Sequence, residues 1–277
     1  MDRIDALKSI AAQAGRGELH FPTNVDATLK LQRALGDPEC HIDDAVRLVQ
    51  AEPLLAARTV AIANSAAYNR GGHEVTNVKA AVQRVGFRTI GALAAAVIVR
   101  QLASGIVEPG LRAKADRLWQ HTAHVAALSQ VIARRVSFVD PETAMFAGIV
   151  HEVGGFYVLS RAAEFPGLLE GDPDEWMEHG EVAIGRGVLL KLGVPAAVMG
   201  AIEAMWNGMR ALPPETLGDT LLLANDLCPV PSPLLERPAV AGLQASATID
   251  FTVGEGTLAS ILEESAEEVR SLGAALS

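Results

Sequence analysis

The sequence predicts an all-α protein of two coupled helical subdomains, and three observations lead to that prediction. Hydrophobic residues make up 49% of the 277 residues and charged residues 20%, which is enough to build one large core or two coupled ones. Alternating runs of β-branched and aromatic residues are nearly absent, so strands are not expected. Ala, Leu, Val, Gln, Arg and Glu recur instead at the three- and four-residue spacing of amphipathic helices.

The first block of helices is expected over residues 1–107. One helix is predicted from Val25 to Leu35, because Asp37-Pro38 directly after it stops a helix. A second carries an apolar stripe from Ile42 to Val49, and a third begins with Pro53, where the missing N–H costs nothing. We expect Asn64-Ser65 to end the third helix as capping and turn residues.

Two further helices complete this block. Valines at steps of three and four predict a helix over Val75–Val85, which Gly86 can close in a left-handed conformation. An Ala-rich helix buried on most sides is expected over Phe87–Leu102. The turn signal Glu108-Pro109-Gly110 is the best internal boundary of the chain.

The second block is expected over residues 108–230, followed by a proline-containing loop and a helical tail over 231–277. Gly154-Gly155 is expected to stop one of its helices, and the tail is expected to be helical from Thr257 to Leu276. The other helices predicted by spacing and by their end signals span Leu118–Ile132, Thr143–Val153, Trp176–Leu192, Ala196–Trp206 and Thr216–Leu227.

Charge and composition exclude several classes of function. The formal net charge is −10, and no basic cluster or basic recognition helix is visible, so binding to nucleic acid or to an anionic membrane is not expected. The charged N-terminus is not a signal peptide, and the most apolar stretch, Ile90–Ile98, is about half of a membrane span. Cys40 and Cys228 are expected to be reduced core thiols. We therefore expect a cytoplasmic protein.

Several short motifs occur in a specific order along both blocks. The first block carries Asp44-Ala-Val-Arg-Leu-Val-Gln-Ala-Glu-Pro, then Ala63-Asn-Ser-Ala-Ala-Tyr68 and Val78-Lys-Ala-Ala-Val-Gln-Arg-Val-Gly86. The second carries Leu118-Trp-Gln-His121, Ala147-Gly-Ile-Val-His-Glu-Val-Gly154, Gly187-Val-Leu-Leu-Lys-Leu-Gly-Val-Pro195 and Leu222-Leu-Ala-Asn225. Over roughly residues 20–230 this set resembles the HDOD family, the HD-related output domain of bacterial signalling proteins, in which Asn64, Ser65, Gly86 and Gly154 are structural signature positions.

The resemblance implies a helical fold whose second subdomain is like an HD-type metal-dependent phosphohydrolase. Such hydrolases hold metal with a His, a His-Asp pair and a later Asp. Here His121 matches the first ligand, His151-Glu152 stands where the pair belongs, and Asn225 falls where the last Asp should be. Glu152, in place of the Asp of this pair, moves the carboxylate by about 1.5 Å because its side chain is one methylene longer. This is far beyond the roughly 0.2 Å tolerance of metal–ligand distances. Asn225, in place of the last Asp, lacks the negative charge of a carboxylate. The neighbouring Asp226 cannot take its place, because adjacent residues of a helix project about 100° apart.

These four positions are therefore interpreted as a relic of a metal site, with no bound metal, no cofactor and no catalytic residue. A plainer interpretation makes His121 a buried, hydrogen-bonded core histidine, and a polar network among the four is expected in either case. His179, on the long helix that follows, is expected to be a solvated helix residue, and apolar Met205-Trp206 stand where family members often carry histidines.

Two hypotheses of function follow. The first is a non-catalytic output or interaction module of bacterial signal transduction, which contacts an unidentified signalling protein and binds, at most, a small molecule in the relic cleft. The alternative is a metal-dependent phosphohydrolase acting on a nucleotide or a cyclic dinucleotide. The occupancy of the site by metal distinguishes the two, and fold kinship alone does not.

Overall fold

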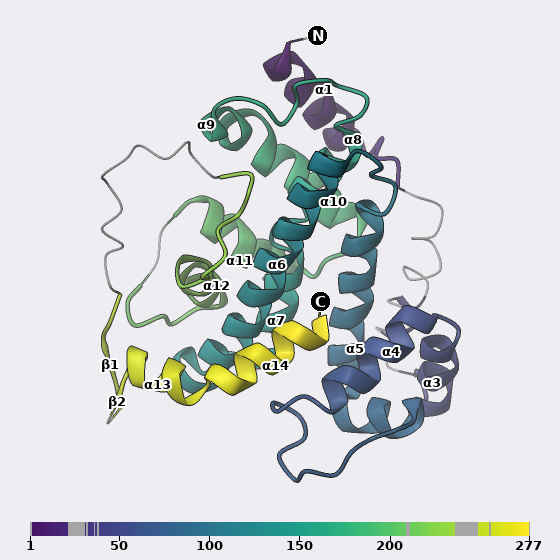
Figure 1. Ribbon diagram of the computed structural model, residues 1–277, viewed down its shortest axis with the longest axis vertical. Coiled ribbons are helices and arrows are strands. Elements are labelled where there is room, and N and C mark those ends of the chain that lie inside the picture. The colour runs from purple at the N-terminus through teal and green to yellow at the C-terminus, as the bar shows by residue number, and fades with distance from the viewer. Residues whose placement is uncertain are drawn as a thin grey trace.

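The computed structural model shows a helical protein, as the sequence predicts (Figure 1). It describes residues 2–21, 31, 33–35, 37, 39–208, 211–235, 249–254 and 256–276. Most of the helix predicted over Val25–Leu35 and the end of the proline-containing loop lie outside the described residues. Within the described part, the only strands are β1 (Thr252–Val253) and β2 (Gly256–Thr257), an antiparallel pair of two residues each.

The N-terminal block packs three helices together: α3 (Ile42–Gln50), α4 (Pro53–Ala63) and α5 (Val78–Leu102). Pro53 occupies the first turn of α4, as predicted. The chain departs from helical geometry at Gly86, whose φ of 78° is one that only glycine adopts easily, so α5 consists of two helices joined at a kink. By length and composition α5 could cross a membrane, but 67% of its apolar window is buried, as expected for a core helix of a soluble protein.

The centre of the molecule is built around α6 (Pro109–Ile132) and α7 (Pro141–Val150), which pack closely on each other (Figure 1). α7 also contacts α5, so it joins the N-terminal block to the rest. Gly148 permits this closeness, because a Cβ there would lie 2.5 Å from the Cα of Ala126. The chain continues from α6 through a π-helical turn, Ala133–Ser137, before α7 begins.

The prediction that Gly154-Gly155 stop the helix after Thr143 is wrong. α7 ends at Val150, and after the His151-Glu152 turn α8 (Val153–Arg161) runs straight through both glycines. A Cβ on Gly154 would lie 2.8 Å from the Cα of Gly185, so this glycine is required where α8 crosses its neighbour rather than as a helix terminator. The chain therefore breaks three residues earlier than expected, at the candidate site itself.

The remaining helices of the second block lie beside this pair. The long helix expected over Trp176–Leu192 is a continuous run of α9 (Pro173–Trp176), a π-helical turn over Met177–Glu181 and α10 (Val182–Lys191). Next come α11 (Ala196–Trp206) and α12 (Leu217–Asp226), which pack on each other, and α12 also packs on α6.

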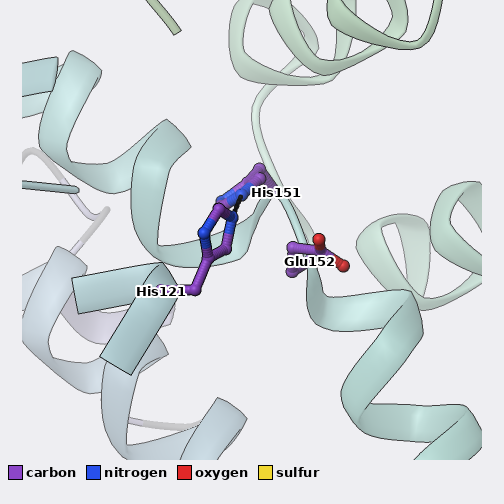
Figure 2. A group of neighbouring side chains, drawn as sticks. All are labelled: His121, His151 and Glu152. Atoms are coloured by element: carbon purple, nitrogen blue, oxygen red, sulfur yellow. Dashed lines mark hydrogen bonds between the residues drawn. The ribbon is translucent and has the colours of Figure 1, made fainter. Parts of the chain in front are cut away.

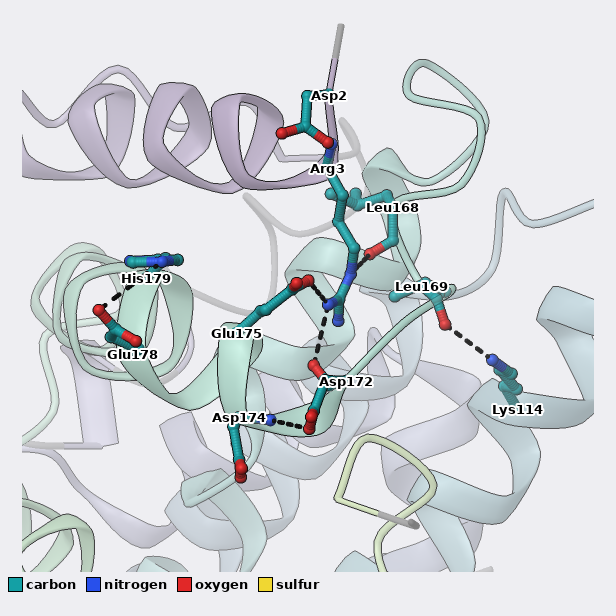
Figure 3. Close-up of polar contacts among 10 residues, drawn as sticks. All are labelled: Asp2, Arg3, Lys114, Leu168, Leu169, Asp172, Asp174, Glu175, Glu178 and His179. Atoms are coloured by element: carbon teal, nitrogen blue, oxygen red, sulfur yellow. Dashed lines mark hydrogen bonds and ion pairs between the residues drawn. The ribbon is translucent and has the colours of Figure 1, made fainter. Parts of the chain in front are cut away.

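Both ends of the chain are fastened to the body. The first helix, α1 (Arg3–Gly15), packs on α10, and Arg3 forms an ion pair with Glu175 and donates to the carbonyls of Leu168 and Asp172 (Figure 3). At the other end, α13 (Leu258–Glu264) and α14 (Ala266–Leu276) follow the short hairpin. α14 packs across α6 and α4, and an Arg134–Glu268 ion pair of 2.9 Å fastens it. The boundaries at 107 and 230 stay predictions, because α1 and α14 both pack across them.

Candidate functional site

Three buried side chains meet where α6 passes the break between α7 and α8 (Figure 2). His121 comes from the buried face of α6, and His151 and Glu152 form the two-residue turn between the other helices. Donor atoms of the three lie within 4.8 Å of one another, and the residues are 2%, 4% and 6% exposed respectively. The structure thus brings together three of the four relic positions that the sequence predicts.

The hydrogen bonds of the two imidazoles fix their tautomers. The Nδ1 atom of His121 lies 2.7 Å from the Val230 carbonyl oxygen, and that of His151 lies 2.7 Å from the Gly148 carbonyl oxygen. A carbonyl only accepts, so both Nδ1 atoms must donate. The two Nε2 atoms then face each other at 3.2 Å (Figure 2). Two neutral rings would present two lone pairs there, so the pair needs one additional proton or a cation.

Burial determines the electrostatics of this cluster. Loss of water and, to a smaller extent, the neighbouring His121 lower the pKa of His151 to about 3, against an opposing effect of the Gly148 carbonyl. Burial raises the pKa of Glu152, while His121 and a hydrogen bond from Ser232 act in the opposite direction. His151 is therefore neutral at pH 7, and the carboxyl group of Glu152 is held closer to its neutral form than an exposed glutamate.

A segment that sequence reasoning missed covers this cluster. We call residues 228–235 the strap; it follows α12 and carries prolines at alternating positions, Pro229, Pro231 and Pro233. Its Val230 carbonyl accepts from His121, and its buried Ser232 hydrogen-bonds Glu152. The sequence predicts a loop here, but no local pattern in it indicates that the loop folds back onto the cluster.

The fourth relic position differs from the other three. Asn225 lies in the last turn of α12, half-buried, and contributes a neutral amide. Asp226 is exposed and does not belong to the group, which within the described residues contains no other His, Cys, Asp or Glu. Cys228 is half-buried at the start of the strap, and burial raises its pKa to about 11, so it is an unreactive thiol.

Glu181 is an acidic neighbour of the cluster. It lies in the π-helical turn before α10 and is half-buried. Burial, reinforced by the nearby Glu152, raises the pKa of Glu181 to about 8. His179, two residues earlier, lies 3.8 Å from the carboxylate of Glu178 (Figure 3). The sequence predicts that His179 is a solvated helix residue, but its side chain is only 18% exposed.

The signature residues of the N-terminal block make structural contacts. Asn64 caps the end of α4, and its amide pairs with both backbone groups of Val75, at 2.7 and 2.8 Å. The Ser65 hydroxyl donates to the carbonyl of Ile62 one turn earlier, at 2.7 Å, as a turn residue at a helix end does. These bonds hold the loop between α4 and α5 closed.

The donor set fits a metal ion in part. The two Nε2 atoms lie 3.2 Å apart. An ion bonded to both at about 2.1 Å would have an N–metal–N angle of about 100°, which lies between the tetrahedral and octahedral values. Carbonyls that orient both Nδ1–H groups are also the usual outer partners of metal-bound histidines. Glu152 could supply a third ligand, but Asn225 offers no fourth charged one. No hydrolytic step follows from this set.

Comparison with known proteins agrees with this architecture. Over its whole length the chain is similar to a solved structure described as a "Putative metal-dependent phosphohydrolase" from Shewanella amazonensis, with a TM-score of 0.71, 18% identity and 100% of each chain covered. It is also similar to an HDOD domain protein of unknown function from Geobacter sulfurreducens, with a TM-score of 0.64 and 18% identity over 99% of this chain and 98% of that one. At such identities the likeness shows the fold alone.

A third solved structure and the family model extend the comparison. A "Putative signal transduction protein" from Marinobacter aquaeolei has a TM-score of 0.57 and 18% identity over 99% of this chain and 66% of that one. No curated protein matches the chain. The model of the HDOD domain matches residues 21–170, a range that includes His121, His151 and Glu152 but not Asn225. The chain therefore belongs to the HDOD domain family.

Proposed function

We propose that this HDOD protein is a non-catalytic output module of bacterial signal transduction, which acts in the cytoplasm by contact with a signalling protein. The observation that carries the proposal is the burial of His121, His151 and Glu152 beneath the strap, with exposed fractions of 2%, 4% and 6%. A catalytic metal centre keeps a coordination position open to water and substrate. Here backbone and hydroxyl groups of the strap engage two of the three side chains.

The chemistry of the fourth position supports the same proposal. A metal that activates water for attack on a phosphate is normally held by carboxylates and imidazoles. Asn225 replaces a charged ligand by a neutral amide, and Asp226 beside it is exposed and lies outside the group. The buried cluster is better suited to join α6, the turn after α7 and the strap into one unit than to turn over a substrate.

Metal content is the first test of this proposal. Purified protein is incubated separately with Mn, Fe and Zn, desalted and analysed by ICP-MS, with His151→Ala as the site control. We expect less than about 0.1 metal ion per chain in every condition, as a closed site with an incomplete ligand set implies. Near-stoichiometric metal that disappears in His151→Ala would overturn the proposal.

One observation favours a second candidate, a metal-dependent phosphohydrolase acting on a nucleotide or cyclic dinucleotide. The two Nε2 atoms face each other at 3.2 Å with both Nδ1–H groups already engaged, an arrangement that a cation between the rings would complete. If the metal analysis is positive, hydrolysis of bis(p-nitrophenyl) phosphate tests this candidate. Activity that requires both metal and His151 would support it, and metal binding without activity would exclude it.

A further inference from the structure

A second concave site lies away from the histidine cluster. It is a cavity of about 690 Å³, which we call the corner cavity, and its size is that of sites for small organic molecules. Its walls are the first part of α5 after the Gly86 kink, the first two turns of α7, the corner between α10 and α11, and Arg33 and Leu35 of the N-terminal block. None of the three cluster residues lines it.

The body of the corner cavity is apolar. Phe87 and Phe146 face it from α5 and α7, and Leu190, Leu192 and Val198 come from the α10–α11 corner. Leu190 is 65% exposed, which is unusual for a large hydrophobic side chain with a core nearby. These side chains offer a surface on which the apolar part of a ligand loses contact with water.

Gly91 keeps this cavity open. It lies in the interior of α5, where glycine costs about 1 kcal/mol of helix stability relative to alanine. Close packing does not require it, because a Cβ built there meets no atom within 4 Å. Its backbone φ is not in the positive range that demands glycine. Any larger side chain at position 91 would extend into the cavity, whereas glycine leaves that volume free.

The charged lining of the corner cavity is suited to an anion. Lys191, Arg33 and Arg88 line the cavity with one carboxylate, Glu142, in a protein whose net charge is −10. Arg88 also forms an ion pair with Asp140 at 3.0 Å, so Lys191 and Arg33 supply most of the positive charge. The first turn of α11 also borders it, and Pro195 at the cap of that helix provides no side-chain hydrogen bond. The N–H groups of that turn therefore add positive potential next to Lys191.

We propose that the corner cavity binds a small amphipathic organic anion, with an apolar body of acyl or aromatic type and a single carboxylate or phosphate head. The body lies between Phe87 and Phe146 over Gly91, and the head lies at Lys191 and the start of α11. The cavity joins α5 of the N-terminal block to α7, α10 and α11, so a bound ligand fastens the two blocks together. This proposal is independent of whether the histidine cluster holds a metal.

The test uses three probes that share one alkyl chain: decanoate, decyl phosphate and decyltrimethylammonium, each at concentrations where it stays monomeric. Binding to the full-length protein is measured by isothermal titration calorimetry. We expect both anions to bind with one site per chain and the cation at least tenfold more weakly. Equal affinity for the cation, or many molecules bound per chain, would overturn the proposal.

Two glycine variants locate the site. Gly91→Leu fills the cavity and should weaken decanoate binding at least tenfold, while its open surroundings and better helix propensity keep the protein folded. Gly200→Leu is the matched control, because Gly200 is an exposed glycine of α11 that also has no atom within 4 Å of a Cβ and does not line the cavity. Equal affinities of the two variants would place any binding elsewhere and contradict the proposal.

A charge variant tests the position of the head group. Lys191→Glu should weaken the binding of decanoate and decyl phosphate at least tenfold. Decyltrimethylammonium should then bind this variant as tightly as the two anions, or more tightly. Lys79→Glu, at a lysine of α5 that pairs with Asp43 and does not line the cavity, is the control for the overall change in charge. If both charge variants weaken the anions equally, attraction is non-specific and the assignment of the head group is wrong.

Discussion

The Nε2 atoms of His121 and His151 lie 3.2 Å apart in a buried site, while the Nδ1 atom of each ring donates to a backbone carbonyl. The two imidazoles thus face each other, and each is held in place from a different part of the chain. His151 is held by its own helix end at Gly148, and His121 is held by the strap. The pair joins α6, the turn after α7 and the strap.

This arrangement predicts a strongly non-additive response to substitution. His121→Leu or His151→Leu alone should lower the free energy of unfolding by about 2–4 kcal/mol, because each leaves a buried polar ring facing an apolar side chain. The double variant should cost at least about 1 kcal/mol less than the sum. Urea denaturation of the four proteins measures the coupling. Additive effects would mean that the rings do not depend on each other.

The strap makes a separate prediction through Ser232, which is 4% exposed and hydrogen-bonds Glu152. Ser232→Ala should destabilise the protein by about 1–3 kcal/mol, because the buried carboxyl group loses a partner that water cannot replace. Ser104→Ala is the matched control, since that exposed serine bonds only the carbonyl of Gln101. Thermal and urea unfolding of both variants give the comparison, and equal effects would contradict a role of the strap in covering the cluster.

The sequence predicts the fold well because the apolar spacing of α5, α6 and α11 is a local property that tertiary contacts do not change. It also identifies His121 and His151, since each lies in a recognisable motif. It fails where the structure depends on residues distant in sequence. Ser232 is 80 positions after Glu152, and no pattern predicts that the loop folds back onto the turn. The expectation at Gly154 is wrong for a similar reason, because helix crossing and helix termination require the same residue type.

Close packing of α6 on α7 can be tested at Gly148. A Cβ there would lie 2.5 Å from the Cα and 2.8 Å from the backbone nitrogen of Ala126, and backbone atoms cannot move aside as a side chain can. Gly148→Ala should therefore lower the free energy of unfolding by about 3 kcal/mol or more. Gly200→Ala, in an open helical position, should instead raise it by about 0.5–1 kcal/mol. Urea titrations separate the two, and a neutral Gly148→Ala would show that these helices can separate at little cost.

Glu181 gives the protein a pH dependence of definite sign. Its pKa is raised to about 8 in the folded state from an ordinary value of 4.5, so between these pH values the folded protein holds a proton that the unfolded chain releases. The free energy of unfolding therefore falls as pH rises from about 4.5 to about 8, and below 4.5 this residue contributes no pH dependence. Glu152, whose pKa is also raised, acts in the same direction.

Glu181→Gln keeps the shape of the side chain and removes its ionisation, so it should reduce this fall. Relative to wild type, we expect it to stabilise the protein at pH 8 by roughly 1–3 kcal/mol more than at pH 5. Glu178→Gln is the control, because the Glu178 side chain is 75% exposed and should leave the wild-type slope unchanged. Urea titrations at pH 5, 6, 7 and 8 measure both slopes. If Glu181→Gln parallels wild type throughout, the carboxyl group is already ionised in the folded protein, and burial beside Glu152 does not hold its proton.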